Sequence, residues 1–141
     1  MNEGEFKDRT KQFALRVIRL VEALPTRSTA AVIGKQLLRS ATSVGANYRA
    51  ACRGKSSADV INKLCIVEEE ADESLYWMEL LIETNLVAEA KLGSLMAETN
   101  EIIGMTVSSI KTLRSRRFAS VNPKSKINPL RNRKWARPLI P

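Results

Sequence analysis

The sequence predicts an all-α protein: an antiparallel up-down-up-down four-helix bundle over residues 1–117, followed by a disordered or extended basic tail over residues 118–141. Three observations predict this fold. Four long segments repeat apolar residues at steps of three and four, which lines them along one face of a helix. Short connections between these segments favour antiparallel neighbours. Only 6 glycines and 5 prolines, with no long alternating apolar run, argue against a β fold.

The first predicted helix covers residues 5–24. Pro25 ends it, because proline disfavours helical geometry in the residue that precedes it. Further apolar residues widen the main stripe, which suits a helix packed against two neighbours. The stripe consists of Phe6, Thr10, Phe13, Val17, Leu20 and Leu24.

The second predicted helix begins near Ser28 or Thr29 and ends near Arg53. Gly34 and Gly45 lie inside it, and a glycine within a helix costs about 1 kcal/mol relative to alanine. Two explanations fit these glycines. Either a neighbouring helix approaches closely, or the glycines have drifted into a helix that tertiary contacts hold.

A short polar turn joins the second helix to the third. Gly54 can end the earlier helix, and Ser57 or Asp59 can cap the later one. The third predicted helix covers residues 57–84, with Asn85 as its C-terminal cap. The two helices form a predicted antiparallel hairpin.

The fourth predicted helix begins around Ala88, and its pattern stops after Phe118. The tail beyond it holds four prolines and six bases but no acid. A segment of this composition cannot bury enough apolar surface to fold alone.

Charge is unevenly distributed along the chain. Residues 1–55 carry 11 bases and 4 acids, residues 56–110 carry 2 bases and 11 acids, and residues 111–141 carry 10 bases and no acid. An acidic middle therefore lies between two basic flanks. Antiparallel packing sets the basic second helix beside the acidic third, so salt bridges are expected between these helices or between copies of the protein.

Two basic clusters and the tail are the candidate nucleic-acid contacts. In an up-down bundle the end of the second helix and the end of the fourth lie at the same end, where their charges suit phosphate backbones. Trp135 of the tail is a candidate for stacking on an exposed base. The alternative is that these bases are solubilising charges paired with the acidic third helix. The candidates are Arg39, Arg49, Arg53 and Lys55; Lys111, Arg114, Arg116 and Arg117; and Lys124, Lys126, Arg131, Arg133, Lys134, Trp135 and Arg137.

Catalysis is not expected. The chain has no histidine, which removes the usual general base and the Glu-x-x-His metal pairs of bundle proteins, and it has no glycine-rich phosphate loop. Its carboxylates are predicted to form a solvated or salt-bridged face, with no metal and no cofactor. Cys52 and Cys65 are predicted to lie too far apart in the hairpin for a disulfide and to stay reduced. No membrane span and no secretory signal are recognisable, so a cytoplasmic location is expected.

The central part of the chain resembles a known bacterial family. The residues that carry the resemblance are RSATSVGANYR at 39–49, SAD at 57–59 with KL at 63–64, and EEEADES at 68–74 with WMELL at 77–81. They resemble four-helix-bundle proteins encoded in intervening sequences of 23S ribosomal RNA genes, over roughly residues 5–117. The resemblance implies a ring-like homopentamer without known catalysis. The accessory variability proteins of diversity-generating retroelements are similar in fold. They are pentameric and basic, and they bind nucleic acid together with a reverse transcriptase.

Residues and resemblance together predict a non-catalytic homo-oligomer that binds RNA or DNA backbones through basic surfaces, as an accessory to a partner such as a reverse transcriptase. The alternative function is a protein-interaction scaffold that does not bind nucleic acid directly. In that case the tail is a docking segment that orders on binding.

Overall fold

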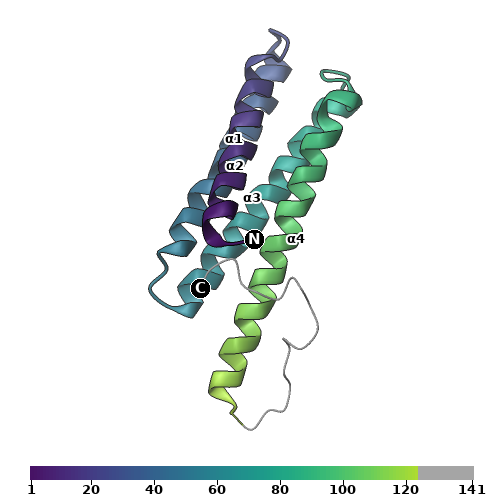
Figure 1. The fold of residues 1–141 in the computed structure, drawn as a ribbon. Coiled ribbons are helices and arrows are strands. Elements are labelled where there is room, and N and C mark those ends of the chain that lie inside the picture. The colour runs from purple at the N-terminus through teal and green to yellow at the C-terminus, as the bar shows by residue number, and fades with distance from the viewer. Residues whose placement is uncertain (124–141) are drawn as a thin grey trace.

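The structure is a computed structural model that describes residues 1–123, and it confirms the predicted helical bundle. Four helices alternate in direction: α1 (Glu3–Glu22), α2 (Ser28–Cys52), α3 (Ser57–Glu83) and α4 (Glu89–Val121) (Figure 1). Residues 1–123 contain no strand. Helix α4 continues past the predicted bundle boundary at residue 117 and past the predicted stop at Phe118.

Helices that follow one another in the chain pack against each other. The most extensive packing is between α2 and α3, followed by α3 with α4 and α1 with α2, while α1 and α4 meet along a smaller contact. The core runs the length of the bundle. Its largest fully buried side chains are Tyr48, Phe6, Phe13, Leu37, Leu64, Met78, Leu81, Leu92 and Ile102.

The start of α3 corrects one prediction. Its cap is Ser56, whose hydroxyl accepts a hydrogen bond from the Asp59 N–H at 3.1 Å, and not Ser57 or Asp59. The Asp59 carboxylate instead accepts from the Lys55 N–H at 3.2 Å. The sequence pattern is ambiguous here because three candidate capping side chains lie within four residues.

Helix α3 ends one residue before the predicted position, with Thr84 as its C-cap, and the predicted cap Asn85 follows it. Asn85 adopts φ 57, the left-handed conformation that often follows a helix. The N–H groups of Asn85 and Leu86 donate to the carbonyls of Ile82 and Leu81 at 2.9 and 3.0 Å, which satisfies two of the last carbonyls of the helix.

The glycines of α2 mark close contact with α1. A Cβ on Gly34 would lie 3.3 Å from a methyl carbon of Val21 on α1 and 2.8 Å from one of Leu24 just after α1, and a Cβ on Gly45 would lie 3.3 Å from the Thr10 hydroxyl oxygen. These distances support close approach over drift. Gly54, in the α2–α3 turn, does not have a positive φ. It is required for space, because a Cβ there would lie 2.4 Å from a methyl carbon of Val60.

Buried polar groups are satisfied inside the bundle. Ser74 on α3 donates to Ser40 on α2 at 2.9 Å in the core, and Thr10, Thr99 and Thr106 each donate to a carbonyl one turn earlier. Within residues 1–123, no buried side-chain nitrogen or oxygen is left without a partner. The buried polar side chains of the described residues are therefore paired within the bundle.

Candidate nucleic-acid interface

Arg39 lies in a salt bridge between helices. Its guanidinium contacts the carboxylates of Glu70, at 3.4 Å, and Glu73 on α3. The Arg39 guanidinium donates a hydrogen bond to the Glu73 carboxylate, which holds the pKa of Glu73 below its ordinary value of 4.5. The Trp77 indole N–H also donates to this carboxylate, at 3.2 Å. An ion pair of the kind expected between the basic second helix and the acidic third helix is therefore present. It involves Arg39, which is one of the candidate nucleic-acid contacts.

The other bases of the first cluster are not neutralised in this way. Arg49, Arg53 and Lys55 are exposed, and none has a carboxylate within ion-pair distance among residues 1–123. Arg49 and Arg53 are one helical turn apart, so they lie on the same face of α2. Lys55 follows in the turn that Gly54, Ser56 and Asp59 shape.

The second cluster occupies the last turns of α4. Lys111, Arg114, Arg116 and Arg117 are exposed and have no ion pair in the described part of the chain. The Arg114 guanidinium lies 3.7 Å from the Cys65 sulfur on α3. Figure 1 shows these turns at the same end of the bundle as the α2–α3 turn and extending beyond it. We refer to Arg49, Arg53, Lys55, Lys111, Arg114, Arg116 and Arg117 together as the basic end.

The remaining candidates belong to the tail. Lys124, Lys126, Arg131, Arg133, Lys134, Trp135 and Arg137 lie outside the described residues. Two exposed apolar side chains occur instead on the part of α4 that the sequence pattern did not assign to a helix. Phe118 and Val121 are 54% and 72% exposed, and their spacing of three residues is the signal that could have extended the predicted helix.

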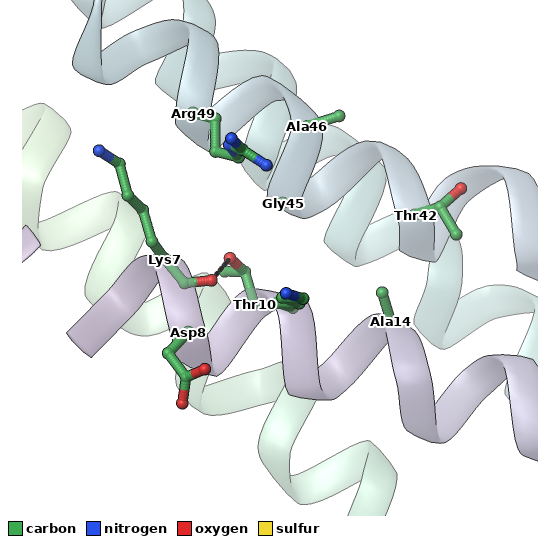
Figure 2. Close-up of a pocket in the computed structure, with 9 residues that line it drawn as sticks. Lys7, Asp8, Thr10, Ala14, Thr42, Gly45, Ala46 and Arg49 are labelled. Atoms are coloured by element: carbon green, nitrogen blue, oxygen red, sulfur yellow. Dashed lines mark hydrogen bonds between the residues drawn. The ribbon is translucent and has the colours of Figure 1, made fainter. Parts of the chain in front are cut away.

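A groove between α1 and α2 was also not predicted. It has a volume of about 530 Å³, and its lining combines Lys7, Lys11 and Arg49 with small side chains. Figure 2 shows Lys7 on α1 and Arg49 on α2 beside this groove. The sequence signal was present, because Lys7 and Lys11 are four residues apart and share a helix face. The sequence alone does not show that the α1 face with Lys7 and Lys11 lies beside Gly45 of α2, because only the fold brings the two together.

The family follows from comparison with known proteins. The model of the 23S rRNA-intervening sequence protein family matches residues 3–108. The chain belongs to this family. A similar solved structure is that of a protein of unknown function of the S23 ribosomal protein family from Bacteroides thetaiotaomicron. It is 42% identical with a TM-score of 0.71, and the match covers 74% of this chain and 97% of that one. No curated protein matches the sequence.

Only part of the basic end lies within the region that the family model matches. In this 23S rRNA-intervening sequence family member, the bases that close α2 lie within the matched region, whereas those of α4 lie after residue 108. The resemblance seen in the sequence is thus confirmed at the level of family and fold. The α4 bases lie on the part of the last helix that continues past the matched region.

Other chemistry is sparse in residues 1–123. Cys52 and Cys65 are free and half-buried, and burial raises the pKa of the Cys52 thiol. In that part of the chain, no three histidine, cysteine or acidic side chains are grouped so that they could hold a metal ion. No described helix has a sufficiently long apolar run to cross a bilayer.

Proposed function

We propose that this protein binds nucleic acid through the phosphate backbone, using the basic end as its contact surface. One observation carries the proposal. Arg39 is held by two carboxylates, whereas the seven bases of the basic end are exposed and have no ion pair within residues 1–123. Unpaired cations on one end of a rigid bundle release counterions from a polyanion without first breaking internal salt bridges.

The same surface favours backbone contact over base reading. Arginine and lysine dominate it, and in the described residues its aromatic content is the exposed ring of Phe118. Phosphate contacts fix position without reading sequence, whereas base-specific contacts need side chains directed at base edges. We expect binding to depend strongly on salt and weakly on sequence.

Self-association is part of the proposal. Val32 on α2 and Tyr76 on α3 are 64% and 53% exposed, and such side chains gain from burial between subunits. A ring would repeat the basic end around its rim and multiply the phosphate contacts. The pentameric state and a partner such as a reverse transcriptase are proposed from the family resemblance alone, and the cytoplasmic location stays a prediction.

Fluorescence anisotropy of the full-length protein tests this function. A labelled RNA hairpin and a labelled DNA duplex would be titrated across a salt series, with Arg116→Gln/Arg117→Gln compared with Lys35→Gln/Lys91→Gln. Lys35 and Lys91 are exposed bases outside the basic end, so the control removes the same charge.

Two outcomes decide the proposal. It predicts that removing the two α4 bases lowers the slope of log affinity against log salt by about 1.5 to 2, and that the control lowers it less. Absence of binding to either nucleic acid at low salt would refute it. That result would favour the alternative scaffold function, for which the exposed Tyr76 and Val32 are the candidate contacts.

A further inference from the structure

The groove between α1 and α2 is formed by two matching stripes. On α1, Lys7, Lys11 and Ala14 follow one another at steps of four and three residues, which keeps them on one helix face. On α2, Thr42, Ala46 and Arg49 do the same. Each stripe is cationic toward the basic end and small toward the middle of the bundle.

The charges in the groove are available to a ligand. Lys11 and Arg49 are exposed, and within residues 1–123 neither is in an ion pair. Lys7 donates to Glu3 at 2.7 Å, which uses one of the three N–H donors of its ammonium group. Asp8 is the one acid in the lining, and Figure 2 shows its carboxylate directed away from α2. The groove therefore presents net positive charge.

The floor of the groove favours a polyanion over a protein helix. Ala14, Thr42, Gly45 and Ala46 contribute no side chain larger than threonine. A docking helix would find no large apolar group to pack against, so burial would contribute little to its affinity. A phosphate backbone needs space and cations, and this floor lets it approach both helices closely.

The groove also leads into the basic end. Arg49 lines the groove and belongs to the basic end, and Arg53 follows it one turn later on the same face of α2. A bound strand that leaves the groove past Arg49 therefore meets Arg53 and then the α2–α3 turn.

We propose that the α1/α2 groove is a second phosphate-backbone site, which holds a nucleic-acid strand on Lys7, Lys11 and Arg49 and guides it onto the basic end. This inference rests on the proposed function. It adds a contact site that charge clustering in the sequence does not reveal, and it predicts a binding footprint longer than the basic end alone.

The test separates the groove from the basic end. Lys7→Gln/Lys11→Gln removes two groove cations and leaves the basic end intact, and Ala46→Leu obstructs the groove without changing its charge. Ala46 is exposed, so the added side chain does not enter the core. Lys35→Gln/Lys91→Gln is the charge-matched control, and the probe is a labelled 20-nucleotide single-stranded RNA.

We expect the double variant to lower the salt slope by about 1.4 and the affinity on the order of tenfold. We expect Ala46→Leu to weaken binding with little change in slope. Acetylation followed by mass spectrometry should show bound RNA protecting Lys7 and Lys11, but not Lys35 or Lys91.

Three results would overturn the groove site. If the wild-type protein binds RNA while both groove variants match the control and Lys11 stays unprotected, the basic end acts alone and only the groove proposal fails. If the wild-type protein does not bind at low salt, the proposed function and the groove site fail together. If Ala46→Leu changes the sedimentation coefficient and leaves RNA affinity unchanged, the groove is a contact between copies.

Discussion

Gly54 offers the sharpest test of how the turn at the basic end is built. A Cβ added there would lie 2.4 Å from a methyl carbon of Val60, 3.1 Å from the Ala51 carbonyl oxygen and 3.2 Å from the Val60 amide nitrogen. Carbon atoms pack favourably at about 3.5 to 4.0 Å, so the first contact is more than 1 Å too short. Two of the three neighbours are backbone atoms, which cannot move aside without shifting the end of α2 or the start of α3.

We therefore expect Gly54→Ala to lower the free energy of unfolding by about 1 to 3 kcal/mol, the range for forced overpacking. The matched control is Gly104→Ala in α4, where an added Cβ has no neighbour within 4 Å. Because alanine is a better helix former than glycine, this control should raise stability by about 0.5 to 1 kcal/mol. The same chemical change is thus expected to act in opposite directions at two positions.

Urea denaturation followed by circular dichroism measures both effects. All variants should be compared at one protein concentration, because self-association would make apparent stability concentration-dependent. The reasoning would be refuted if Gly54→Ala were as stable as the wild-type protein while Gly104→Ala gained stability as expected. In that case the turn adapts without cost and does not set the positions of Arg53 and Lys55.

Three further perturbations probe the contacts between helices. Arg9→Met removes a guanidinium that donates to Glu98 at 2.6 and 2.9 Å, and thermal unfolding should show a loss of about 1 to 2 kcal/mol because a partly buried carboxylate is left unpaired. Ser40→Ala and Ser74→Ala should each cost about 1 kcal/mol by urea titration, and a double variant that costs less than their sum would confirm their coupling. The pKa of Glu73 is lowered in the folded state, so its contribution to stability is present above its ordinary pKa of 4.5 and is lost as pH falls through the folded value. Glu73→Gln should accordingly flatten acid unfolding curves below that pH, and an unchanged curve would contradict this assignment.

The sequence was sufficient for the helices because their apolar stripes, Pro25 and Asn85 are local signals. Helix ends were less certain wherever several residues could play the same part, as at Ser56 and Asp59. The end of α4 was placed too early because its last turns are exposed and lack the long apolar stripe of the core-facing turns, so that Phe118 and Val121, three residues apart, give only a short signal.

The candidate site was predictable only in part, because the sequence does not show which basic side chains form ion pairs in the fold. In the sequence, Arg39 and Arg49 lie on the same predicted helix, and nothing distinguishes them as candidate contacts. The fold sets Arg39 against Glu70 and Glu73 and leaves Arg49 exposed at a groove. The bases of α1 were overlooked for a similar reason, since their proximity to α2 depends on the close approach that Gly45 permits.

The register of α2 against α3 explains how one end of the bundle comes to be unpaired and basic. The contact between Ser40 and Ser74 fixes that register, so residues later on α2 lie beside residues earlier on α3. The acids of α3 are concentrated from Glu68 onward, and no carboxylate occurs from residue 60 to residue 67. Arg49 and Arg53 therefore pass beside the part of α3 that has no acid to offer them. The acids of α3 from Glu68 onward lie instead beside the earlier part of α2, where Glu70 and Glu73 contact Arg39. The unpaired bases of the basic end would attract a polyanion, because a surface patch of one charge speeds encounter with an oppositely charged partner.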